Sequence, residues 1–120
     1  RQRTTVIAET NTRGQRSIVF ARRFNMQIAA IRMTLYVPES HSLKDKRQIV
    51  RSILAQTKRR FNVSISEIDA LNRQQSIVLG LVTVSNSSVH AQSSLDEAAR
   101  FIEDIAEAAG AECTDIEHVL

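Results

Sequence analysis

The sequence predicts an α+β domain with the ferredoxin-like order β-α-β-β-α-β, because two stretches with helical periodicity alternate with strand-like segments. Apolar residues recur every three or four positions over residues 43–61 and again over residues 95–109. Right-handed crossovers would place both helices on one face of a four-stranded antiparallel sheet, with the first and third strands in the middle. The other face of that sheet would have no helix to cover it.

Each expected strand has its own pattern. The first alternates apolar and other residues and is ended by Pro38, and the second alternates Val63 and Ile65 with serines. The third is almost continuously aliphatic, as in a central strand that is buried on one face and at least partly covered on the other. The fourth alternates only loosely. The four strands are expected at residues 26–37, 62–68, 77–84 and 111–120.

Capping residues mark the expected helix ends. Ser42 is a suitable N-cap for the first helix, and Asp45, three residues later, resembles the reciprocal partner of a capping box. Ser87 or Ser88 is expected to begin the second helix. Gly110 lies where a left-handed helix end would need a glycine.

Length and composition indicate one globular domain. A chain of 120 residues with 42% hydrophobic residues is large enough to bury one core, and no apolar run is long enough for a membrane span. Cys113 is the only cysteine, which excludes an internal disulfide and a zinc cluster and fits a reducing, cytoplasmic compartment. We expect it to be a small, half-buried residue of the last strand.

The first 25 residues differ from the rest in charge and pattern. They hold six arginines against Glu9 and show no sustained helical or alternating pattern. We therefore expect a flexible Arg-rich extension at residues 1–25 and a folded domain at residues 26–120. Other interpretations are a part of a longer protein, a processed end, read-through from an upstream start or an organelle transit peptide.

The first helix concentrates positive charge. Between residues 44 and 60 lie seven cations against Asp45, whereas residues 94–120 hold eight carboxylates against Arg100. Cations near the positive end of a helix dipole do not add stability, so a ligand is one explanation for them. The other is an ordinary solvated face, neutralised by the carboxylates of the second helix. The candidate phosphate contacts are Lys44, Lys46, Arg47, Arg51, Lys58, Arg59 and Arg60.

The uncovered sheet face is the second candidate surface. Both sides of the third strand are aliphatic, and an apolar patch of that kind favours self-association through Val78, Val82 and Val84. A few scattered apolar side chains on a monomer are the plainer interpretation. Base stacking on this face is not expected, because Tyr36 is the only aromatic residue of the two central strands.

The sequence offers no catalytic, metal or cofactor motif. His41, His90 and His118 are too far apart for metal-ligand spacing, and three glycines are too few for a nucleophile elbow or a phosphate loop. Asp45, Glu67 and Asp69 would meet only if their loops folded together. We therefore expect a protein that is not an enzyme, with no cofactor, no membrane association and no small-molecule substrate.

Three spaced motifs resemble the YlxP-like family, a bacterial group of unknown function. They are SLKDKR at residues 42–47, RFNVSI at residues 60–65, and Ser85-Asn86 followed by His90. The resemblance covers residues 26–120 and implies a small ferredoxin-like cytoplasmic protein, often encoded beside translation-initiation and ribosome-maturation genes. Relatives typically carry a Trp in the connection where this chain has Gln74, so a role that needs that aromatic is not implied here.

Two functions follow from these patterns. The leading hypothesis is a non-catalytic protein that binds structured RNA or a ribosomal particle through the basic first helix. The alternative is a homodimeric interaction or regulatory module that uses the open sheet face and has no nucleic-acid role.

Overall fold

A computed structural model describes residues 5–10, 16–21 and 25–120, and side chains from residue 25 onward. In order along the chain, the elements are β1 (Thr5–Thr10), β2 (Arg16–Ala21), β3 (Gln27–Tyr36), α1 (Leu43–Arg60), β4 (Ser64–Asp69), β5 (Ser76–Ser85), α2 (Ser88–Ala108) and β6 (Glu112–His118).

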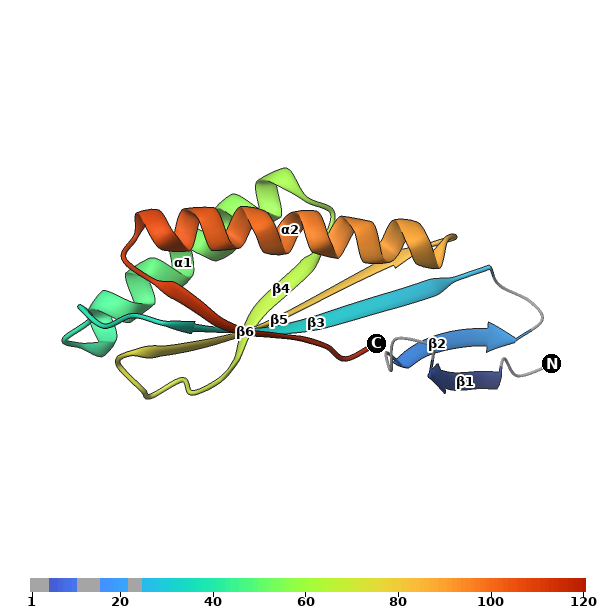
Figure 1. Ribbon diagram of the computed structural model, residues 1–120, viewed down its shortest axis with the longest axis horizontal. Coiled ribbons are helices and arrows are strands. Elements are labelled where there is room, and N and C mark those ends of the chain that lie inside the picture. The colour runs from blue at the N-terminus through green and yellow to red at the C-terminus, as the bar shows by residue number, and fades with distance from the viewer. Residues whose placement is uncertain (1–4, 11–15, 22–24) are drawn as a thin grey trace.

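From β3 onward the topology is ferredoxin-like, as predicted. Strands β3 and β5 pair in the middle of the sheet, β4 joins β5 and β6 joins β3, and all these pairs are antiparallel. Both helices lie on one side of this sheet, and its other side is open (Figure 1). The predicted fold class and strand order are therefore confirmed.

The segment before β3 contains a strand pair that the sequence patterns did not predict. Strand β1 pairs with β2, and β2 continues the sheet through Ile18 opposite Ile28 and Val19 opposite Gln27. The short apolar stretches at residues 6–7 and 18–20 lie in these two strands. Residues 1–4, 11–15 and 22–24 lie outside the described residues, so a flexible extension at residues 1–25 stays a prediction.

The core lies between the helices and one face of the sheet. Alternate residues of β3, from Ala29 to Leu35, and Val37 just after it point toward the helices and are buried, as the alternating pattern predicted. The helices bury their apolar stripes against them. Residues 50, 53 and 57 of α1 and residues 91, 95, 98, 99, 102 and 106 of α2 are buried. Ala109, the last residue of the apolar stripe expected over residues 95–109, follows the end of α2 and is exposed.

The helix ends follow the predicted caps. Ser42 Oγ accepts a hydrogen bond of 3.0 Å from the Asp45 amide, and the Asp45 carboxylate accepts one of 3.3 Å from the amide of His41. The second bond therefore reaches one residue before the cap, whereas a capping box would place it on Ser42 itself. Ser87 caps α2, and Gly110 after that helix has a φ of +84°. No helix in the described part of the chain is long and apolar enough to cross a membrane.

Candidate functional site

The exposed face of α1 is the first candidate surface. Six of the seven cations proposed from the sequence lie on this helix with their side chains exposed. Four of them, spaced by three, four and seven residues, follow one side of the helix over about 21 Å. We call the exposed set the basic stripe: Lys44, Arg47, Arg51, Lys58, Arg59 and Arg60.

The seventh candidate, Lys46, does not belong to this surface, and its assignment as a phosphate contact is corrected. Its side chain is fully buried. The ammonium donates hydrogen bonds of 2.8 Å to the Ala70 carbonyl and 3.0 Å to the Leu71 carbonyl, and lies 2.9 Å from Glu67 Oε2. The ammonium is thus fully buried among protein oxygens, so it is not presented to a ligand on the exposed face of α1.

The sequence contained a signal for this burial. Lys46 precedes Val50 by four residues, Ile53 by seven and Thr57 by eleven, and those three residues form the buried stripe of α1. A lysine at that spacing lies on the apolar face, where its ammonium needs buried partners. The connection after β4 supplies them, and its first residue, Ala70, takes the left-handed conformation with φ of +55°.

No direct ion pair neutralises the basic stripe within the described part of the chain. The ion pairs found there are Arg32–Asp69, His41–Glu39, Lys46–Glu67 and His118–Asp96, and none involves an exposed cation of α1. The Arg60 guanidinium instead lies 4.9 Å above the ring of Phe101 on α2, in a cation–π contact. The acidic side chains of α2 thus form no direct ion pair with the stripe.

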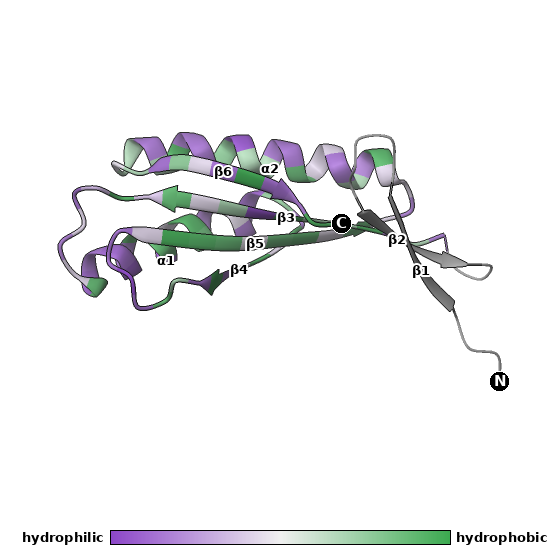
Figure 2. Cartoon of the chain, turned by 60° about the horizontal axis from the view of Figure 1, so that its bottom comes forward, coloured by the Kyte–Doolittle hydropathy of each residue, from purple (hydrophilic) through white to green (hydrophobic). Residues whose placement is uncertain are grey.

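The open face of the sheet is the second candidate surface (Figure 2), where apolar colouring runs along β5. The three valines proposed for it differ in exposure: Val78 is 5% exposed, Val82 38% and Val84 55%. The cross-strand neighbours of Val82 are Ala30 on β3 and Ser64 on β4, whose small side chains leave it exposed. Val84 lies past Ser64, the first residue of β4, so no residue of β4 pairs with it.

The assignment of Val78 to the dimer face is accordingly corrected, because its side chain is packed against its neighbours and not exposed to a partner. It lies between Thr34 on β3 and Asp69 on β4, where the ladder shifts register between Glu67 and Asp69. Ile68, within that shift, lies over Gly80, and a Cβ at Gly80 would come within 3.0 Å of it. The bulge in β4 therefore re-aims its side chains across the open face.

A shallow apolar groove of about 560 Å³ crosses this face from β4 over β5 and β3 to Glu117 of β6 and to Val119, which follows β6. Ile68, Val82 and Val119 are its exposed apolar residues. Arg32 lies in it opposite Glu117 in register, and its guanidinium is 3.9 Å from the Asp69 carboxylate. The face thus combines apolar contact area with charges of both signs.

The three carboxylates considered as a catalytic group do not meet. Asp45 accepts a backbone bond at the start of α1, Glu67 pairs with Lys46, and Asp69 lies near Arg32. Among the described residues, no group of His, Cys, Asp or Glu has the arrangement of a metal site. Cys113 is half-buried in β6 as predicted, and burial, helped by the carboxylates of Glu103 and Asp115, raises the pKa of its thiol.

Together the fold and the two surfaces define a small ferredoxin-like α+β domain with a basic helix on one side and an open sheet on the other. The chain belongs to the family described as "Protein of unknown function (DUF503)", whose model matches residues 28–117. A curated relative is "Uncharacterized protein YlxP" of Bacillus subtilis (strain 168), 36% identical over 69 residues, which cover 58% of this chain and 75% of the relative. The YlxP-like resemblance is confirmed.

Solved structures share the fold at low sequence identity. One is a C-terminal segment of the alpha subunit of aIF2 from Pyrococcus abyssi, with a TM-score of 0.54 and 11% identity over 83% of this chain and 54% of that one. Another is a putative amidohydrolase/peptidase from Burkholderia cenocepacia, with a TM-score of 0.53 and 10% identity over 79% of this chain and 28% of that one. This chain therefore spans about half or less of these proteins, and the likeness is one of fold.

Proposed function

We propose that this protein is a non-catalytic RNA-binding protein of the bacterial cytoplasm that holds structured RNA, free or in a ribosomal particle, along α1. The basic stripe carries the proposal. Six exposed cations on one helix have no carboxylate partner among the described residues, so their charge is available to a polyanion. Lys and Arg contacts to phosphates supply most of the sequence-independent part of such binding.

The arrangement also explains an otherwise unfavourable placement. Lys44 and Arg47 lie in the first turns of α1, where the helix dipole opposes positive charge. Stability alone therefore favours other residues at these two positions. Neutralisation by phosphate would offset that cost in the complex.

Salt dependence is the first test. If the four cations of the stripe that follow one side of α1 each neutralise one phosphate, the logarithm of the association constant should fall with the logarithm of salt with a slope of about −3. Raising salt from 50 to 200 mM should then weaken binding by about 60-fold. Fluorescence anisotropy with a labelled RNA stem-loop measures both quantities.

Charge reversal is the second test. The variant Arg47→Glu/Arg51→Glu should lose RNA binding and keep the parent's unfolding midpoint, because both side chains are exposed. The matched control is Arg73→Glu/Arg100→Glu, which changes the net charge equally at exposed positions off the stripe. Equal affinity of the first variant and the parent would end the proposal, and equal losses in both variants would reduce it to a nonspecific charge effect.

A homodimer that meets through the open sheet face is the second candidate function. Two observations favour it: the apolar groove, and the charges of opposite sign on the register neighbours Arg32 and Glu117. A two-fold interface places the same face of both copies together, so Arg32 of one copy can lie against Glu117 of the other. Sedimentation equilibrium of Val82→Lys/Val84→Lys should then show a shift toward monomer. The control is Val89→Lys, which lies on α2 and is 78% exposed. A parent that sediments as a monomer at high concentration would exclude this candidate.

A further inference from the structure

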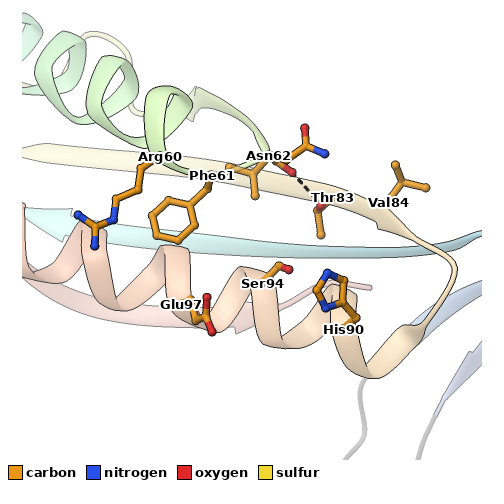
Figure 3. Close-up of a pocket in the computed structure, with 9 residues that line it drawn as sticks. Arg60, Phe61, Asn62, Thr83, Val84, His90, Ser94 and Glu97 are labelled. Carbon is orange, nitrogen blue, oxygen red and sulfur yellow. Dashed lines mark hydrogen bonds between the residues drawn. The ribbon is translucent and has the colours of Figure 1, made fainter.

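A small pocket lies where the C-terminal end of α1 meets α2 and the end of β5 (Figure 3). Two of the motifs that resemble the YlxP-like family come together here: residues 60–63 at the end of α1, and His90 on α2. Residues 83–84 of β5 complete the lining. The volume is about 170 Å³. A cavity of about 150 Å³ takes a benzene ring, so this pocket suits one group of ring size.

One wall of the pocket is aromatic and held in place. The Phe61 ring is half-buried, and its centroid lies 5.5 Å from that of Phe101 at an interplanar angle of 59°. Arg60 lies over the same Phe101 ring. Phe61 therefore presents a fixed ring edge or face to the pocket, and Val63 extends the apolar lining.

The opposite wall is polar. His90, Ser94 and Glu97 lie on one face of α2, at spacings of four and three residues, and line the pocket. Among the described residues, their side chains form no hydrogen bond or ion pair; His90 donates only its backbone amide, to Ser87. Three hydrogen-bonding groups are thus free beside an aromatic wall. The Glu97 carboxylate can accept, the Ser94 hydroxyl can donate and accept, and the His90 imidazole can donate.

The pocket also continues the basic stripe. Arg60 is both the last residue of the stripe and a lining residue, and Lys58 and Arg59 directly precede it. A chain of phosphates bound along α1 would therefore bring its next nucleotide to the mouth of the pocket. An aromatic wall with hydrogen-bonding groups opposite is the usual surface for an unstacked base of single-stranded RNA.

We propose that this pocket binds one unpaired base of an RNA whose phosphates lie along α1, and that guanine is the preferred base. Guanine presents two neighbouring N–H donors on its Watson–Crick edge, which match the Glu97 carboxylate, and a carbonyl acceptor, which matches Ser94 or His90. Uracil has a single N–H donor on that edge and leaves half of the carboxylate unpaired. This inference rests on the proposed RNA-binding function.

Free nucleosides test the pocket without phosphates. Titrating guanosine, and separately uridine, into the full chain labelled with ¹⁵N should shift the amides of residues 60–63, 83–84 and 90–97 with guanosine only. Glu97→Gln should remove these shifts, and Glu107→Gln, an exposed carboxylate near the end of the same helix, should not. Equal shifts with both nucleosides, or shifts outside these residues, would overturn the base assignment.

A short RNA that can reach both the basic stripe and the pocket provides the second test. An oligouridylate with one central guanine should bind the parent about tenfold more tightly than oligouridylate alone, the gain expected of a good two-point base contact. Glu97→Gln should lose that preference and keep the salt slope. Salt-dependent binding without a guanine preference would overturn the pocket and leave the α1 proposal standing. Absence of all RNA binding would overturn both.

Discussion

The Lys46 ammonium lies 2.9 Å from Glu67 Oε2, and the two side chains are 0% and 13% exposed. The pair joins α1 to β4, and the same ammonium also binds the carbonyls of Ala70 and Leu71. One buried cation thus anchors the first helix to the edge strand and to the turn that follows it. Within the described residues this ion pair is the only partner of that Glu67 oxygen.

Removing the cation should therefore be costly. Lys46→Met should lower the free energy of unfolding by about 3–5 kcal/mol, because it leaves a buried carboxylate and two carbonyls without a donor. The double variant Lys46→Met/Glu67→Leu should recover part of the loss, because no charge then remains buried. Urea denaturation measures both variants, and Lys44→Met, an exposed neighbour, should stay within about 0.5 kcal/mol of the parent. An equally small effect at position 46 would contradict the anchoring role.

The hydroxyl of Thr57 should be removable at a gain. Thr57 is fully buried on α1, and its Oγ1 has no hydrogen-bond partner among the described residues. Thr57→Val keeps the shape and removes the unsatisfied group, so the free energy of unfolding should rise by about 1 kcal/mol. A lower denaturation midpoint than the parent's would mean that the hydroxyl has a partner in solution, such as a bound water.

The Ser42 cap should contribute a measurable share of stability. Ser42→Ala removes the acceptor of the 3.0 Å bond from the Asp45 amide and should cost about 1 kcal/mol. Ser42→Gly should cost only a few tenths. Ser42 lies beside Lys44 at the start of the basic stripe, so RNA affinity is measured alongside. Unchanged stability with weaker RNA binding would make Ser42 a contact residue instead.

The thiol of Cys113 should react slowly and make stability depend on alkaline pH. Its pKa is raised by burial and then by nearby carboxylates, so the unfolded chain releases the thiol proton first, near its ordinary pKa of about 8.5. The stabilising effect is complete below that pH and is lost as pH rises toward the folded pKa. Cys113→Ser should lack this loss, as measured by urea denaturation between pH 7 and 10. Alkylation at pH 8 that is as fast in the folded as in the unfolded chain would refute the raised pKa.

Local patterns in the sequence were enough for the fold from β3 onward. Alternation in residues 26–37, helical spacing in residues 43–61 and the serines at positions 42 and 87 each depend on a few consecutive residues, and each was found where it was predicted. The two-strand segment before β3 was missed because its apolar stretches are too short to show a period.

Three features of the candidate sites depended on tertiary structure. Lys46 is buried and not part of the basic stripe, because it contacts Glu67 and the carbonyls after β4. These partners are more than twenty residues away in sequence, so local spacing did not reveal them. Val78 is packed and Val82 exposed because strand register decides which neighbours flank each valine. The pocket beside Phe61 exists because the end of α1 meets α2 and the end of β5 there. Periodicity assigns each of these residues to a face of its own element, but only the contacts between elements decide what covers that face.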